Sequence, residues 1–344
     1  MVRLLARLFG RFVVALVILA VTAWGALALV YSSLLTEPLR APAAGLFGLA
    51  GIVAAAVVLF SRRRWRAVGA FAAAFLLLLV WWSTVRPSNK RDWQPEVAVL
   101  PYATIDGDLI TLHNMRNFEY RSETDFTPAY YDTTFDLRRL DSVDLIATYW
   151  MGPTIAHIML SFGFAGQDYV AFSIETRKER SEEYSTLKGF FRQYELYYVV
   201  ADERDVLRVR TNYRKDPPED VYLFRVRGPT ENARRVFMEY VRKINALKER
   251  PEFYNTLTTN CTINILMHTR VNPGHLAFSW KVLLSGYAPE YVYDNGRLDT
   301  SMPFEDLKKR SRVNEAAQAA DRAPDFSRRI RAGLPGTKIT KITP

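Results

Sequence analysis

YNTLTTNCTINILMH, from Tyr254 to His268, contains Cys261, the only cysteine among the 344 residues of the chain. Three residues of types that favour helix N-caps, Thr258, Thr259 and Asn260, come directly before this cysteine, and a helix-compatible apolar run follows it. A polar cap ahead of such a run predicts a helix start. We therefore expect Cys261 to lie in the first turn of a helix.

This position favours a reactive thiol. In the first helical turn, unpaired backbone N–H groups and the positive end of the helix dipole stabilise a thiolate. Cys261 is therefore a candidate nucleophile. The alternative interpretation is a small apolar residue buried in the core.

A predicted β-hairpin supplies a partner for this thiol. Residues 155–164 and 168–175 read as two strands, and Ala165-Gly166-Gln167 can turn the chain between them. A three-residue loop pairs Phe164 with Asp168, which places His157 directly across from Glu175 on one face. A carboxylate beside an imidazole supports a general base, but the same pair also fits a structural ion pair.

Other chemistry finds less support in the sequence. His268 lies seven residues after Cys261, about 10 Å along a helix, which is too far for direct proton transfer. His113 and His275 have no strand carboxylate that we can pair with them. We find no metal-binding pattern, no phosphate-binding loop and no nucleic-acid module, so we expect no metal, no cofactor and no nucleic-acid partner.

The first 86 residues predict a membrane region. Three uncharged runs give helices at about 12–35, 44–60 and 67–85, and arginines cluster at residues 3–11 and 62–66. The positive-inside rule places both clusters in the cytoplasm, and three crossings then place the chain after Arg86 outside the inner membrane, in the bacterial periplasm. The net charge of +10 thus comes partly from the arginines that set the membrane topology. A single cysteine excludes an internal disulfide framework.

The remaining sequence predicts an α+β domain. We expect a helix over 186–196, a short strand over 206–209 and an amphipathic helix over 230–247. A charged helix is expected from Pro303 to Ala323. The basic end of the chain is expected to be poorly ordered, either as a solvated tail or as an arm on anionic lipid.

Several stretches together resemble one bacterial family. They are NFEYRSETDF, SVDLIATYWMG, IAHIMLSFGF, YVAFSIETRKE, YELYYVVADERDVLRVRTNYR, EFYNTLTTNCT, LDTSMPFEDL and DFSRRIRAGLP, between Trp93 and Pro335. They are similar to the periplasmic domain of the Lnb-type lipoprotein N-acyltransferases. The resemblance implies a circularly permuted papain-like domain at 87–300, with an antiparallel sheet packed on the cysteine helix. The transmembrane region at 1–86 would precede it, and a helical extension with a basic tail at 301–344 would follow.

The same resemblance implies the roles of the site residues. Cys261 would be the nucleophile, His157 the general base and Glu175 the third member. The reaction would move an acyl chain from a phospholipid to the N-terminus of a lipoprotein through a thioester. The backbone N–H of Cys261, with Asn260 or Tyr254, would stabilise the oxyanion, and Arg177 would meet lipid phosphates unless it belongs to a solvated turn.

Two other functions remain open from the sequence. A membrane-tethered cysteine peptidase or amidase acting on peptidoglycan would use the same dyad with water as the acceptor. A non-catalytic, membrane-anchored binding protein would need neither Cys261 nor His157.

Overall fold

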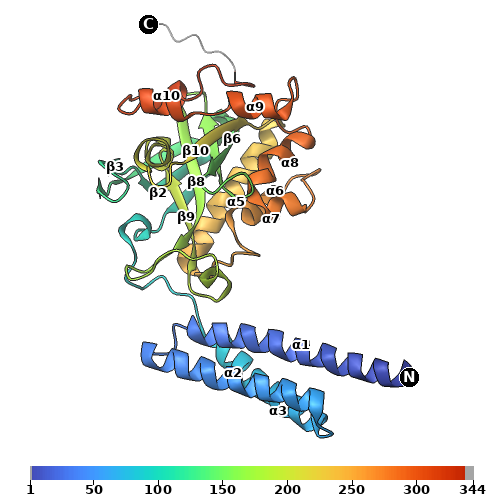
Figure 1. The fold of residues 1–344 in the computed structure, drawn as a ribbon. Helices are drawn as coiled ribbons and strands as arrows, with labels where there is room; N and C mark the ends of the chain where they lie inside the picture. Colours follow the sequence, from blue (N-terminus) through green and yellow to red (C-terminus); the bar gives the residue numbers. More distant parts are fainter. Residues whose placement is uncertain (1, 338–344) are drawn as a thin grey trace. The chain divides into compact units, whose positions relative to one another are not determined.

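Three long apolar helices open the chain (Figure 1). The computed structural model describes residues 2–337, and these first helices are α1 Val2–Val30, α2 Glu37–Phe60 and α3 Arg64–Ser83. Each is long and apolar enough to cross a membrane. The three predicted helices are therefore present with different ends, and α1 starts at Val2 rather than near residue 12. Arginine is a good helix former, so the basic residues at 3–11 belong to this helix.

Small residues let these helices approach closely. A Cβ atom added at Gly51 of α2 would collide with the side chain of Thr22 on α1, and one added at Gly25 would meet Phe47. The Thr22 hydroxyl is buried and donates to the carbonyl of Ile18 at 2.6 Å. Small residues and satisfied hydroxyls at a helix contact are typical of helices that pack within a bilayer.

The segment 184–195 belongs to the same compact unit as these helices. The ring of Phe191 lies 5.7 Å from that of Tyr31 and 6.4 Å from those of Trp24 and Trp82. Arg192 donates to the carbonyl of Trp82 at 2.9 Å. The predicted helix over 186–196 is wrong, because the segment forms only a 3₁₀ turn at Lys188–Phe190 and its conformation follows these aromatic contacts.

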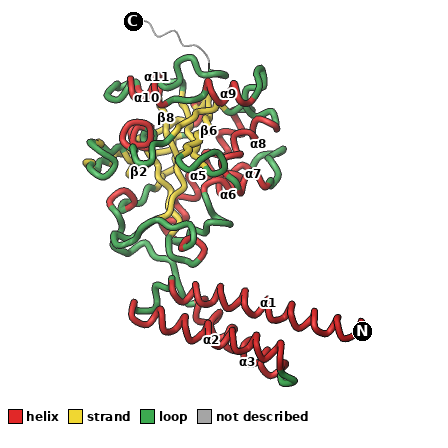
Figure 2. Tube along the Cα trace, viewed as in Figure 1, coloured by secondary structure: helices red, strands yellow, loops and turns green. Residues whose placement is uncertain are grey.

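A second compact unit, residues 89–183 and 196 onward, is built on one large sheet (Figure 2). Its order is β1-β2-β9-β8-β7-β6-β10, with β5 also paired to β2, and β3 pairs with β4 separately. The strands are β1 Tyr102–Asp106, β2 Leu109–Arg116, β3 Glu119–Tyr120, β4 Phe126–Thr127, β5 Tyr130–Asp136, β6 Leu140–Tyr149, β7 Ala156–Phe164, β8 Asp168–Arg177, β9 Glu195–Ala201 and β10 Asp220–Arg225. The β6–β7, β7–β8 and β6–β10 pairs are antiparallel, and β2 meets β9 in parallel. The expected α+β class is confirmed.

Alternate residues of the strands face two different layers of helices. Phe162 and Phe172 pack against Phe237 of α5, while Met159 and Ala171 belong to a core cluster with the C-terminal helices.

The helices of this unit are α4 Glu203–Val206, α5 Thr230–Glu249, α6 Cys261–Thr269, α7 Trp280–Leu283, α8 Ala288–Asp294, α9 Phe304–Arg310, α10 Asn314–Ala319 and α11 Phe326–Arg329. The amphipathic helix predicted at 230–247 is thus confirmed as α5. The strand predicted at 206–209 is wrong, because Asp202 caps α4 and a π-helical turn, Val209–Tyr213, follows.

The C-terminal region is part of this core. Phe326, Ile330 and Leu334 are buried among the residues of the sheet, and the charged helix expected over 303–323 is instead the separate helices α9 and α10. Arg331 is buried and bonds both Asp144 and Glu203. We expected the basic end of the chain to be poorly ordered, and this prediction is wrong for the residues up to 337. The last part of the predicted tail, residues 338–344, lies outside the described residues.

Candidate active site

Cys261 occupies the first position of α6, as the capping pattern predicted. The Asn260 side chain accepts a hydrogen bond from the backbone N–H of Ile263 at 2.8 Å, which makes Asn260 the N-cap. The Asn260 amide also donates to the carbonyl of Thr256 at 2.9 Å. The thiol therefore lies at a well-capped helix start, where the helix dipole favours negative charge.

The predicted hairpin places His157 beside Glu175. β7 and β8 are paired from Phe164–Asp168 to Met159–Ser173, the predicted register. Continued by two residues, this register sets His157 opposite Glu175. Nε2 of His157 lies 3.1 Å from Oε1 of Glu175, so the two side chains meet on one face as expected.

Ser173 connects these two side chains. Its hydroxyl oxygen lies 2.6 Å from Nε2 of His157 and donates to Oε1 of Glu175 at 2.6 Å. A hydroxyl that gives its proton to a carboxylate accepts from the imidazole, so Nε2 carries a proton. The sequence offered a signal for this role, because Ser173 precedes Glu175 by two residues and shares its face of β8.

The sulfur of Cys261 completes the cluster. His157 and the backbone N–H of Ile158 both favour a negative charge on this sulfur, and Oγ1 of Thr262 lies 3.7 Å from it. Nε2 of His157 faces Ser173 and Glu175, which leaves Nδ1 as the ring nitrogen that is not engaged by these two residues. The structure therefore brings together Cys261, His157 and Glu175, three residues that are distant in the sequence.

The charges in this cluster support a thiolate–imidazolium pair. Burial works to lower the pKa of His157, but the negative charges of Glu175 and Cys261 outweigh it and raise the pKa to about 9. Burial works to raise the pKa of Cys261, but His157 and the hydrogen bonds to the sulfur bring it below the ordinary value. Both shifts favour a proton on the imidazole and a negative charge on the sulfur.

A buried arginine supports Glu175 from the other side. Nη2 of Arg210 lies 3.2 Å from Oε1 of Glu175, and Nη1 of Arg210 lies 3.2 Å from Glu219. Arg214 also bonds Glu219 at 2.7 Å. Against the effect of burial, His157 and Arg210 hold the pKa of Glu175 well below its ordinary value. Sequence reasoning missed Arg210, which lies on the π-helical turn, a structure often found near functional sites.

The other predicted contact residues have different surroundings. The Asn260 amide caps α6, and Tyr254 is buried in the segment that precedes this cap. Arg177 was predicted either to meet lipid phosphates or to lie in a solvated turn, and both expectations are wrong. It is 2% exposed, donates to the carbonyls of Val97 and Ala98, and lies over the ring of Trp93. Arg177 therefore ties the entry of the domain to β8.

The remaining histidines do not join the cluster described above. His268 bonds the hydroxyl of Tyr198 at 2.8 Å, and burial lowers its pKa to about 4, so it stays neutral. His113 does have a strand carboxylate, contrary to the expectation, because its Nδ1 lies 2.7 Å from Asp132 on β5. Nδ1 of His275 lies 3.2 Å from the carbonyl of Asn272.

These features define a class: a membrane protein whose sheet-rich domain carries a buried thiol–imidazole–carboxylate cluster at a helix start. Residues 126–286 match the family model described as the Lnb N-terminal periplasmic domain, so this part of the chain is a domain of the Lnb type. His157, Glu175 and Cys261 all lie within the matched residues. No curated protein and no solved structure matches the chain. The protein is therefore a membrane protein with a periplasmic domain.

Proposed function

We propose that this protein is a periplasmic thiol acyltransferase of the inner membrane. It would move an acyl chain from a phospholipid, through a thioester on Cys261, to an amine, the N-terminus of a lipoprotein. The observation that carries the proposal is the cluster of Cys261, His157 and Glu175, in which the imidazole pKa is raised and the thiol pKa is lowered. An acyl transfer needs such an activated nucleophile beside an acid.

The first half-reaction forms the thioester. The Cys261 thiolate attacks the ester carbonyl of the lipid, and the backbone N–H of Cys261 faces the developing oxyanion at the helix start. When the tetrahedral intermediate collapses, its bond to the glycerol oxygen breaks and the His157 imidazolium gives that oxygen its proton. The products are acyl-Cys261, a lysophospholipid and a neutral imidazole.

The second half-reaction returns the enzyme to its starting state. A neutral amine attacks the thioester, His157 takes one proton from the attacking nitrogen, and the carbon–sulfur bond breaks to release an amide. The thiolate–imidazolium pair is restored. Ser173 and Glu175 hold the protonated Nε2 throughout, so Nδ1 is the nitrogen that gives and takes the proton.

The proposed anchoring suits two lipid-bound substrates. In this proposal α1, α2 and α3 all cross the inner membrane, with the arginines at 3–11 and 62–66 in the cytoplasm. We propose also that the domain is a circularly permuted papain-like fold. Its support is the chain order, in which the histidine strand β7 precedes the cysteine helix α6.

The test is complementation of a strain that lacks the gene. Wild type, Cys261→Ala and His157→Ala are compared by mass spectrometry of lipoprotein N-terminal peptides and of cell-wall peptides. His113→Ala serves as the matched control, because His113 also pairs with a carboxylate but lies on β2. We expect the amide-linked acyl chain in wild type and His113→Ala, and its loss in the other two variants.

Other results would decide for the alternatives. Altered wall cross-links with unchanged lipoproteins would show a peptidase or amidase acting on peptidoglycan. Full function in both Cys261→Ala and His157→Ala would show a non-catalytic anchored binding protein.

A further inference from the structure

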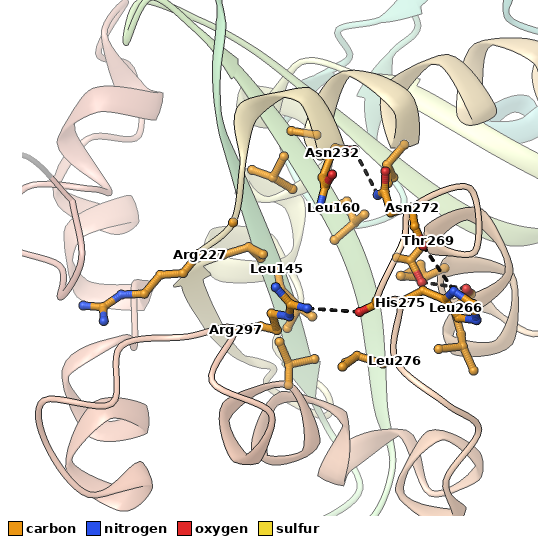
Figure 3. Close-up of a pocket in the computed structure, with 18 of the residues that line it drawn as sticks. Leu145, Leu160, Arg227, Asn232, Leu266, Thr269, Asn272, His275, Leu276 and Arg297 are labelled. Carbon is orange, nitrogen blue, oxygen red and sulfur yellow. Dashed lines mark hydrogen bonds between the residues drawn. The ribbon is translucent and has the colours of Figure 1, made fainter.

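A large apolar cavity lies on the side of β6 and β7 that faces α5 and α6 (Figure 3). Its empty volume is about 1220 Å³ including the solvent-filled mouth, and α5, α6 and α8 form its other walls. Nearly half of its lining residues are aliphatic, among them Leu145, Leu160, Val236, Ile265, Leu266 and Val292. A lining with many apolar side chains and a few polar groups is typical of sites for small-molecule ligands.

The cavity begins beside the proposed nucleophile. Two of its lining residues, Ile158 and Thr262, are also direct partners of the Cys261 sulfur. The backbone N–H of Ile158 favours a negative charge on the sulfur, and the same residue lines the cavity. From Thr262 to Thr269 the cavity follows α6 for about 10 Å.

The polar side chains of the cavity already bond to the protein itself. Asn272 accepts from Arg235 at 2.7 Å and donates to the carbonyl of Asn232 at 3.1 Å. The Thr269 hydroxyl donates to the carbonyl of Leu266, and the Arg297 guanidinium donates to that of Gly274. A polar ligand such as a peptide or sugar would therefore compete with these bonds, whereas a hydrocarbon chain would leave them intact.

The guanidinium of Arg227, another lining residue, also bonds within the protein. In Figure 3 its guanidinium extends away from the other labelled side chains, and it bonds Asp299 at 2.7 Å. Arg227 and Arg297, the arginines of the cavity, thus both have partners within the protein.

We propose that this cavity holds the acyl chain during transfer, both in the donor lipid and in the Cys261 thioester. The inference rests on the proposed function and extends it, because it locates the chain-binding site and predicts chain-length selectivity. Each buried methylene adds roughly fourfold to binding. The same lining disfavours the wall peptides of a peptidoglycan hydrolase.

Photocrosslinking of the full chain tests the binding site without catalysis. Cys261→Ala protein is placed in phosphatidylethanolamine vesicles that contain a palmitoyl analogue with a terminal diazirine, and the adducts are mapped by mass spectrometry. We expect adducts on peptides of α6 and α8. Ala233→Phe and Val292→Phe, which fill the cavity from different helices, should each reduce them at least tenfold.

Ala246→Phe is the matched control, because Ala246 is exposed on the same helix as Ala233. It should leave the adducts unchanged. Two cavity-filling variants are used so that the test still works if one of them fails to fold. The melting temperature of each variant is measured to show that it is folded. Adducts that lie outside the cavity, or that persist in folded filling variants, would overturn the inference.

A second readout separates the cavity from the proposed reaction. Proteins with Cys261 intact are incubated with palmitoyl and decanoyl phosphatidylethanolamine, and acyl-Cys261 is measured by intact mass. We expect Ala233→Phe to lower the palmitoyl-to-decanoyl ratio at least tenfold relative to wild type. Cavity adducts with no thioester in wild type would refute the transfer reaction alone, while a thioester with an unchanged ratio would refute the cavity alone.

Discussion

The carboxylate of Glu175 lies 3.1 Å from Nε2 of His157, and the hydroxyl of Ser173 bonds to both. This contact supplies the charge that keeps a buried imidazole protonated beside a sulfur. Arg210 then balances the carboxylate from its other side. The pKa of His157 therefore depends on Glu175 and Arg210, and each of these residues can be changed separately.

The pH dependence of alkylation measures the charge pair directly. Since the pKa of Cys261 is lowered, its rate of reaction with iodoacetamide should reach half its maximum below the ordinary thiol value of about 8.5. In Glu175→Gln the carboxylate is gone, so burial and Arg210 lower the pKa of His157, the imidazolium is lost, and the thiol pKa rises. We expect the midpoint to move upward by about one unit or more. Glu315→Gln, at an exposed carboxylate, should match wild type, and an equal midpoint in Glu175→Gln would contradict the assignment.

Ser173→Ala should have an intermediate effect. The substitution removes two short hydrogen bonds but keeps the direct contact of His157 with Glu175. The alkylation midpoint should therefore lie between those of wild type and Glu175→Gln. Ser161→Ala is the control, because this buried serine on β7 bonds Glu203 instead. A midpoint for Ser173→Ala beyond that of Glu175→Gln would show that the hydroxyl, not the carboxylate, sets the pKa of His157.

Arg210→Gln should separate stability from reactivity. Arg210 lowers the pKa of His157, so its removal should raise that pKa and keep the thiolate at neutral pH. Stability should fall by about 3 kcal/mol, because Glu219 and Glu175 lose a buried cation. Thermal unfolding in detergent and the alkylation profile measure the two effects. Arg121→Gln, in an exposed ion pair, should change neither. An alkylation midpoint for Arg210→Gln above that of wild type would show that Arg210 raises, rather than lowers, the pKa of His157.

Arg331 should be essential for folding of the domain. Its side chain is 5% exposed and pairs with Asp144 and Glu203, both fully buried. Arg331→Ala leaves two carboxylates without this cation and should cost about 3–5 kcal/mol in unfolding free energy. Arg329→Ala, at a half-exposed position two residues earlier, should change stability little. Similar unfolding curves for the two variants would show that the C-terminal region is not part of the core.

Local signals explain what could be predicted from the sequence. The cap at Asn260 and the loop Ala165-Gly166-Gln167 are encoded within a few residues, so the positions of Cys261 and His157 followed from them. Arg210 could not be found this way, because it reaches Glu175 from a turn that directly follows a segment whose sequence reads as a strand. Arg331 was likewise read as part of a basic tail, since only the folded sheet supplies Asp144 and Glu203.

The packing of segment 184–195 with the apolar helices bears on how this protein could be prepared in water. Cutting away residues 1–86 would remove Trp24, Tyr31 and Trp82, the ring neighbours of Phe191, together with the two carbonyls that Arg192 bonds. The excised fragment would then display an uncovered aromatic loop and should aggregate. A well-behaved soluble fragment should require polar replacements in that loop as well.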